Sequence, residues 1–96
     1  MKPEEKVKKA VRKILDARGA YYFFPQAGIY GRSGIPDIVG CIAGTFFAVE
    51  CKAGKNMPTA LQEKELLKID EAGGYSWVVN ELTLTSFEAA FKELTK

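Results

Sequence analysis

The chain has 96 residues, enough for one folded core, so we expect a single domain over residues 1–96. Its net charge is only +2 and it contains no histidine, which excludes histidine general bases and most zinc sites. No apolar run approaches the ~20 residues of a membrane-spanning helix, and the charged start lacks the apolar segment of a signal peptide. We therefore expect no membrane partner and a cytoplasmic location, with Cys41 and Cys51 reduced and buried in apolar stretches.

The first predicted element is a helix over residues 3–18, which begins near Pro3 and stops at Gly19. Its apolar residues recur at helical spacing: Val7, Ala10, Val11, Ile14 and Leu15. Residues 1–18 contain seven lysines and arginines against three acidic residues, so the positive charge is concentrated here. A basic helix suits a polyanionic partner, although a solvated helix face has the same composition.

Three strands, a helix, a strand and a last helix are expected to follow. The aromatic residues 21–24 predict a strand of the core, and residues 26–34, with three glycines, predict a loop. Residues 36–42 and 46–52 predict two strands joined by a tight turn at 43–45. A helix over 58–71 and a strand over 75–79 come next, and Thr85 or Ser86 is expected to cap the last helix. The order αβββαβα predicts an α/β fold, a mixed sheet flanked by helices.

Charged residues interrupt the two strands of the expected hairpin. Because side chains alternate along a strand, Glu50 and Lys52 point to the same side of the third strand, near its end. Pairing about the turn places Asp37, near the start of the second strand, opposite residue 50 or 51. The sequence therefore predicts that the three charged groups converge at one end of the sheet.

Two carboxylates and a lysine at one point fit two kinds of site. Carboxylates that lie together repel each other unless a cation lies between them, and their oxygens suit Mg²⁺ together with the phosphate of a substrate. With a lysine that holds a water, the group is suited to metal-assisted hydrolysis of a phosphodiester. The alternative is a structural salt bridge between Lys52 and one of the carboxylates.

The segments GIPDIVG and FFAVECK resemble the signature of the PD-(D/E)XK nucleases, read as Pro36-Asp37 and then Glu50-Cys51-Lys52. More narrowly, the chain resembles the VRR-NUC (virus-type replication-repair nuclease) group over almost its whole length. The positions that carry this resemblance are Gly34, Pro36, Asp37, Gly44, Glu50, Lys52, Gln62 and Gly73 or Gly74. The resemblance implies a restriction-endonuclease-like αβββαβα core.

The resemblance also implies roles for the residues of the motif. Asp37 and Glu50 would ligate Mg²⁺ or Mn²⁺, with the main-chain carbonyl of Cys51 as a further ligand. Lys52 would orient or activate the attacking water. Gln62 would help to hold the lysine or the DNA, although it can equally be an ordinary exposed polar residue.

The group tends to place a glutamate of the first helix at the metal. Here two residues qualify, Glu4 and Glu5, and the helix is about a turn longer than the pattern suggests. Helical phase favours Glu4, because it lies on the side of Val7 and Val11, whereas Glu5 aligns with the solvated lysines. An effect on the helix dipole is the alternative for either residue.

Residues around this group are expected to contact nucleic acid. The loop over residues 26–34 leads straight into Asp37 and its glycines allow a close approach, so it should border the scissile phosphate; a plain turn is the alternative. The candidates for DNA contacts in the loop, after the third strand and on the first helix are Tyr30, Arg32, Ser33, Lys55, Lys8, Lys9 and Arg12.

The resemblance implies a metal-dependent, structure-specific DNA endonuclease. Stand-alone members of the group, mostly viral, look like homodimers that cut branched DNA such as the Holliday (four-way) junction. If the chain is encoded by a phage, its expected location is the cytoplasm of the bacterial host. A flap, single-strand or nicking repair nuclease of the same fold is one alternative. A non-catalytic nucleic-acid-binding module is the other.

Overall fold

A computed structural model describes residues 1–26 and 33–96 of the chain. Its elements are α1 (Pro3–Ala17), β1 (Tyr21–Phe23), β2 (Ile38–Ile42), β3 (Thr45–Cys51), α2 (Ala60–Glu71), β4 (Tyr75–Val79) and α3 (Leu84–Glu93). This is the predicted order, and the predicted α/β class is confirmed. Among the described residues, no helix is long and apolar enough to cross a membrane.

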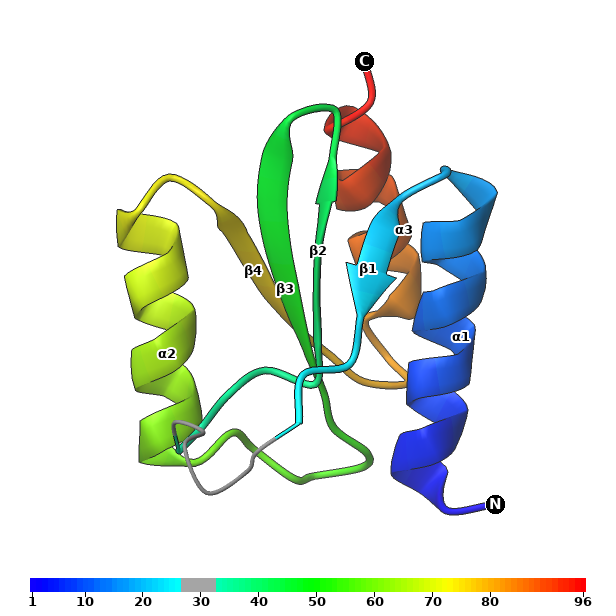
Figure 1. Cartoon of the computed structure of the whole chain (residues 1–96). Coiled ribbons are helices and arrows are strands. Elements are labelled where there is room, and N and C mark those ends of the chain that lie inside the picture. Colours follow the sequence, from blue (N-terminus) through cyan, green and yellow to red (C-terminus); the bar gives the residue numbers. More distant parts are fainter. Residues whose placement is uncertain (27–32) are drawn as a thin grey trace.

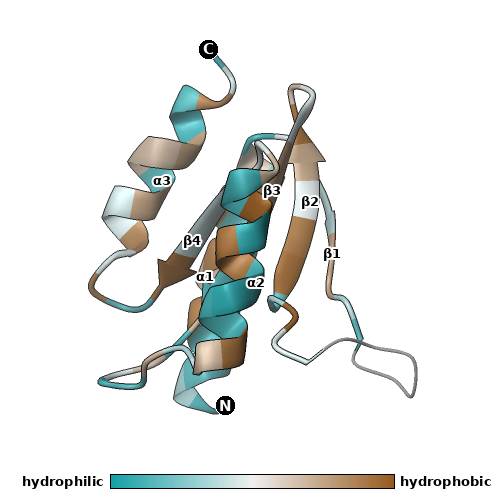
Figure 2. Cartoon of the chain, turned by 90° about the vertical axis from the view of Figure 1, so that its left-hand side faces the viewer, coloured by the Kyte–Doolittle hydropathy of each residue, from teal (hydrophilic) through white to brown (hydrophobic). Residues whose placement is uncertain are grey.

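The four strands form one mixed sheet in the order β1-β2-β3-β4. The first three strands are antiparallel to their neighbours, and β4 runs parallel to β3. One face of the sheet packs against α1 and α3, whereas α2 lies against the other (Figures 1 and 2). Helices therefore flank a mixed sheet, as predicted.

The main hydrophobic core lies between the sheet and the pair α1 and α3. The buried residues of α1 follow each other at intervals of four, which places them on one side of the helix: Val7, Val11 and Leu15. They meet the alternate residues of β3, Phe47, Val49 and Cys51, together with Phe87 and Phe91 of α3. The side of α2 that faces the viewer in Figure 2 carries both hydrophilic and hydrophobic residues.

A two-residue turn sets the register of the β2–β3 hairpin. Ala43 and Gly44 both have positive φ, 50° and 78°, as a type I′ turn requires. The turn pairs Ile42 with Thr45 and, at the far end, Ile38 with Val49. Both strands begin or end within two residues of the prediction, and this register decides what lies beside Asp37.

The predicted cap of the last helix is wrong. The N-cap of α3 is Thr83, not Thr85 or Ser86. The side chain of Asn80 accepts hydrogen bonds from the backbone N–H groups of Leu82 and Thr83, and the Thr83 hydroxyl accepts one from Asn80 N–H. These local bonds fold the chain tightly after β4, so the helix begins earlier than predicted.

Two expectations about burial are also wrong. The aromatic strand β1 lies at the edge of the sheet and is only partly covered, with Tyr21 71% and Phe23 51% exposed. Cys41 is exposed, whereas Cys51 is buried as expected, and both are free thiols. Tyr21 pairs with Cys41 and Cys41 with Phe46, so the three side chains share the face on which α2 covers only part of the sheet.

Candidate active site

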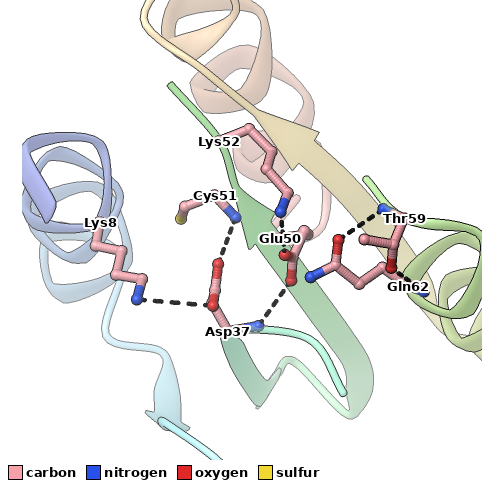
Figure 3. A network of polar contacts seen from close by, with 7 residues as sticks. All are labelled: Lys8, Asp37, Glu50, Cys51, Lys52, Thr59 and Gln62. Carbon is pink, nitrogen blue, oxygen red and sulfur yellow. Dashed lines mark hydrogen bonds and ion pairs between the residues drawn. The ribbon is translucent and has the colours of Figure 1, made fainter. Parts of the chain in front are cut away.

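The hairpin brings Asp37 and Glu50 together at the end of the sheet where β2 begins and β3 ends. The backbone N–H of Asp37 donates to Glu50 Oε1 at 3.2 Å. The backbone N–H of Cys51 donates to Asp37 Oδ2 at 2.8 Å. The predicted convergence across the hairpin is thus present, and each carboxylate is oriented by the backbone of the other strand (Figure 3).

Two lysines approach this carboxylate pair from different sides. Lys52 follows Glu50 by two residues, and its Nζ lies 3.4 Å from Glu50 Oε2. Lys8 extends from α1, and its Nζ lies 3.7 Å from Asp37 Oδ1 (Figure 3). The four formal charges cancel, so this arrangement is neutral as a whole.

The environment of Glu50 opposes its ionisation. Its side chain, on the inner strand β3, is buried, with an exposed fraction of only 1%. Burial and then the negative charge of Asp37 raise the pKa of Glu50 to about 7, against the opposing effect of Lys52. A cation placed between the two carboxylates would remove this penalty, which is the electrostatic property expected of a metal site.

The side chain of Cys51 does not belong to this polar group. It points to the core face of β3 and is fully buried. Burial, and next the charges of Asp37 and Glu50, raise the pKa of the Cys51 thiol to about 12, so it stays protonated at neutral pH. Only the main-chain carbonyl of Cys51 is therefore a reasonable ligand.

Gly34 fixes the segment that leads into Asp37. Its φ is +79°, and a Cβ at this position would lie 2.5 Å from the backbone carbonyl carbon of Leu61 in the first turn of α2. No other residue fits this close approach without a backbone shift. The glycine of the motif thus packs the approach to Asp37 directly on α2.

Gln62 caps the helix on which it lies. Its side-chain oxygen accepts from the N–H of Thr59 at 2.9 Å, while the Thr59 hydroxyl accepts from the Gln62 N–H at 3.2 Å, a complete capping box. The amide nitrogen of Gln62 points toward Glu50 (Figure 3). The capping box therefore holds the Gln62 amide N–H near the Glu50 carboxylate. This capping role of Gln62 was not predicted from the sequence.

The segment after Lys52 is anchored on its far side. The backbone N–H of Lys52 donates to the carbonyl of Val79 at 2.9 Å. The N–H of Gly54 donates to both oxygens of Glu81, at 3.0 and 3.3 Å. Hydrogen bonds from its own backbone N–H and from Gly54 lower the pKa of Glu81. No sequence pattern marked Glu81, because only the parallel pairing of β4 with β3 brings it here.

The two glutamates of α1 lie in different surroundings. Glu4 is partly buried, and its charge is one of those that raise the pKa of Cys51. Glu4 therefore lies on the side of α1 that faces the candidate active site. Glu5 is exposed and lines a groove on the outer side of α1. Over residues 1–26 and 33–96, no group of three His, Cys, Asp or Glu side chains is close enough together to hold a metal ion. The carboxylate pair thus stands without a third side chain of these types.

The expected DNA contacts lie at the same end of the molecule. The N-terminal half of α1, the segment after β3 and the segment before β2 gather there (Figure 1). Lys8, Lys9 and Arg12 line one groove, and Ser33 and Lys55 are exposed. The other two candidates, Tyr30 and Arg32, lie outside the described residues.

The chain is similar to a solved structure described as a VRR_NUC domain. The two superpose with a TM-score of 0.72 over 97% of each chain, at 22% sequence identity. No family model matches the chain, and no curated protein matches it. The likeness shows that the chain has the VRR-NUC fold, which the sequence motif predicted.

Proposed function

We propose that this chain is a metal-dependent DNA endonuclease whose active site is formed by Asp37, Glu50 and Lys52. The observation that carries the proposal is a pair of carboxylates at the end of a hairpin. Each accepts a hydrogen bond from a backbone N–H on the other side of the hairpin, and one of them is buried with a raised pKa. A structural ion pair needs no second carboxylate, and here the negative charge of Asp37 raises the pKa of Glu50. Perturbed carboxylates are typical of catalytic sites.

The residues present fit a divalent cation with oxygen ligands. Asp37 and Glu50 offer carboxylate oxygens and Cys51 a carbonyl, while Mg²⁺ ordinarily keeps several waters and takes a phosphate oxygen of the substrate. Glu4, or else Glu5, would complete the set through a water or a small movement of α1. Bound there, Mg²⁺ or Mn²⁺ would supply Lewis-acid polarisation of the phosphate and lower the pKa of a nearby water.

Lys52 is the residue that we assign to the attacking water. Its ammonium group lies on Glu50 and is largely shielded from solvent, so its position is restricted before substrate arrives. From there it can donate a hydrogen bond to the water and stabilise negative charge that develops on the phosphate. Gln62, whose amide nitrogen points toward Glu50, would keep that carboxylate in place.

Binding of DNA would depend on the positive side chains around this end of the sheet. The residues proposed to contact phosphates from α1 and from the segment after β3 are Lys8, Lys9, Arg12 and Lys55. Those proposed to do so from the segment before β2 are Tyr30, Arg32 and Ser33. Such contacts give affinity that is largely independent of base sequence and falls steeply with salt. Specificity would then come from the shape of the DNA.

We further propose that the substrate is branched DNA, a four-way (Holliday) junction, cut by a homodimer in the cytoplasm of a bacterial host. Two-fold symmetry would present two active sites to two symmetric strands. The exposed aromatic side chains of Tyr21, Phe23 and Phe46 lie on one face of the sheet, and a second copy would cover them.

One cleavage experiment tests this function. Labelled four-way junction, flap and linear duplex are incubated with Mg²⁺, Mn²⁺ or EDTA, using the wild type, Lys52→Ala and the control Lys64→Ala, which alters an exposed lysine of α2. We expect paired cuts in the junction that need the metal and Lys52 but not Lys64. Cuts in flaps alone would replace the resolvase by a flap nuclease, and binding without cleavage would leave a non-catalytic module.

A further inference from the structure

A groove of about 350 Å³ runs along the outer side of α1, next to the segment that leaves β1. Its lining consists of Met1, Glu5, Lys8, Lys9, Arg12 and Phe24. Three of these side chains are positive and one is negative, so the groove favours an anion. The lining also includes the aromatic ring of Phe24, which was predicted to lie in the core.

The ring of Phe24 is held in a defined orientation although it is 39% exposed. Its edge packs on Tyr22, with ring centroids 6.2 Å apart. The hydroxyl of Tyr22 donates to Asp16 of α1 at 2.7 Å, which fixes the pair to the helix. The guanidinium of Arg12 lies over one face of the Phe24 ring, 5.5 Å from its centroid. An exposed ring beside a cation is thus already ordered, which reduces the entropy lost when a flat ligand binds.

Lys8 connects this groove with the candidate active site. Its side chain lines the groove, and its Nζ lies 3.7 Å from Asp37 Oδ1. A DNA strand with a phosphate at Asp37 and Glu50 would therefore pass its neighbouring nucleotide along the groove. The positive side chains match its phosphate, and the ring of Phe24 matches the face of a base.

We propose that the groove binds one unpaired nucleotide next to the scissile phosphate, with its base against Phe24 and its phosphate on Lys9 and Arg12. The proposal rests on the nuclease function and deepens it by naming what the enzyme selects. A continuous duplex keeps its bases paired and stacked, so it cannot fill the groove. A gap or the base of a flap offers an unpaired base, and a four-way junction would offer one where a base pair at its branch point opens.

The test measures binding separately from cleavage. A single-stranded oligonucleotide with 2-aminopurine at successive positions is titrated with protein in Ca²⁺ or EDTA, and fluorescence quenching reports stacking. Stacking of a base on an aromatic side chain contributes enough that Phe24→Leu should weaken binding by about 5- to 100-fold and abolish quenching at one position. Leucine keeps the apolar volume, so the variant should fold. The control Tyr75→Leu, which alters an exposed ring of β4 that has no proposed role, should change neither quantity.

A second pair of variants tests the phosphate contact. Lys9→Ala removes a cation of the groove, whereas Lys6→Ala removes an exposed cation of the same helix that does not line it. Loss of one phosphate contact should lower the slope of log affinity against log salt concentration by about 1 for Lys9→Ala. The slope of Lys6→Ala should equal that of the wild type.

An oligonucleotide with one abasic position separates the two proposals further. The wild type should lose affinity for the abasic strand by the same factor as Phe24→Leu loses for the intact strand, and the two losses should not add.

If Phe24→Leu shows the fluorescence quenching, binding and cleavage of the wild type, the groove proposal is wrong and the nuclease proposal stands. If the wild type cleaves nothing while Phe24→Leu still weakens binding, the nuclease fails and the groove stands. If Phe24→Leu only dissociates an oligomer, the ring belongs to an interface between copies and the groove proposal falls.

Discussion

Glu50 is the one charged side chain that lies buried among the residues the structure describes. Its burial and the negative charge of Asp37 raise its pKa to about 7 from an ordinary 4.5. An ionised carboxylate in this place costs folding free energy at neutral pH, and sites that bind or catalyse commonly carry such a cost. The proposed metal ion would offset it.

The first prediction is that Glu50→Gln stabilises the protein near neutral pH. A carboxyl group with a raised folded pKa holds its proton more tightly in the folded state, so the free energy of unfolding should fall as pH rises from 4.5 to about 7 and then level off. The total fall is on the order of 3 kcal/mol for a shift of this size. Urea unfolding in EDTA at several pH values measures it.

The free energy of unfolding of Glu50→Gln should not fall over this pH range. The control Glu88→Gln, at an exposed position of α3, should show the same fall as the wild type. The variant should also lose cleavage, since glutamine is a poor metal ligand. A wild-type stability that rises between pH 5 and pH 7 while Glu50→Gln follows the same curve would contradict the prediction.

The second prediction concerns the competition between Lys8 and a metal ion. The ammonium group lies 3.7 Å from Asp37 Oδ1, with both side chains partly exposed. Lys8→Met keeps the length of the side chain and removes its charge, so Mn²⁺ without DNA should bind about three- to tenfold more tightly. Calorimetric titration measures this, with Lys6→Met as the charge-matched control. Equal Mn²⁺ affinity in wild type and Lys8→Met would mean that Lys8 does not oppose the ion.

At this scale the sequence predicted the contacts across the hairpin but not those between elements. The distance from Asp37 to Glu50 follows from alternation and a two-residue turn, both readable from residues 36–52. The contact of Lys8 with Asp37 depends on how α1 is rotated on the sheet, which packing of Val7, Val11 and Leu15 decides. The same packing places Phe24 beside Arg12.

Elements are held in place by glycines with different surroundings, which yields the third prediction. Gly34 and Gly19 both have positive φ, but a Cβ at Gly34 would meet the backbone of Leu61, whereas one at Gly19 meets nothing within 4 Å. Gly19→Ala should cost only the left-handed strain of about 1–2 kcal/mol. Gly34→Ala should cost more and displace Asp37, so cleavage falls at least tenfold beyond any unfolding. Chemical denaturation and cleavage rates of the two variants measure the difference; equal effects would contradict it.

The predicted elements agree with the structure wherever local signals decide. The turn residues Ala43 and Gly44 set the hairpin, and the apolar repeat sets α1. The predicted start of α3 was wrong because the side chain of Asn80 folds the preceding turn. An asparagine in a turn is common in loops and does not by itself mark the start of a helix. The exposure of β1 was not predictable from its aromatic composition, since it follows from the position of the strand at the sheet edge.

For the whole molecule, the uneven cover of the sheet provides the fourth prediction. Two helices cover one face, while the other leaves Tyr21, Phe23 and Phe46 exposed. If a second copy covers this face, Phe23→Glu should turn a dimer into a monomer, since it places a charge in the interface. Sedimentation velocity measures the mass, and paired cuts in a junction should become single nicks. The control is Leu82→Glu, an 89% exposed residue outside this face; a wild-type monomer would contradict the prediction.

We interpret Asp37, Glu50 and Lys52 as a catalytic site rather than a salt-bridge cluster. Single-turnover cleavage of a junction by Lys52→Met at saturating protein, with DNA affinity measured separately in Ca²⁺, tests it most directly. We expect a rate at least about a hundredfold lower than the wild type, because a positioned proton donor or electrostatic stabiliser is lost, with affinity changed no more than a few-fold. An unchanged cleavage rate in this variant would mean that the three residues form only a salt-bridge cluster.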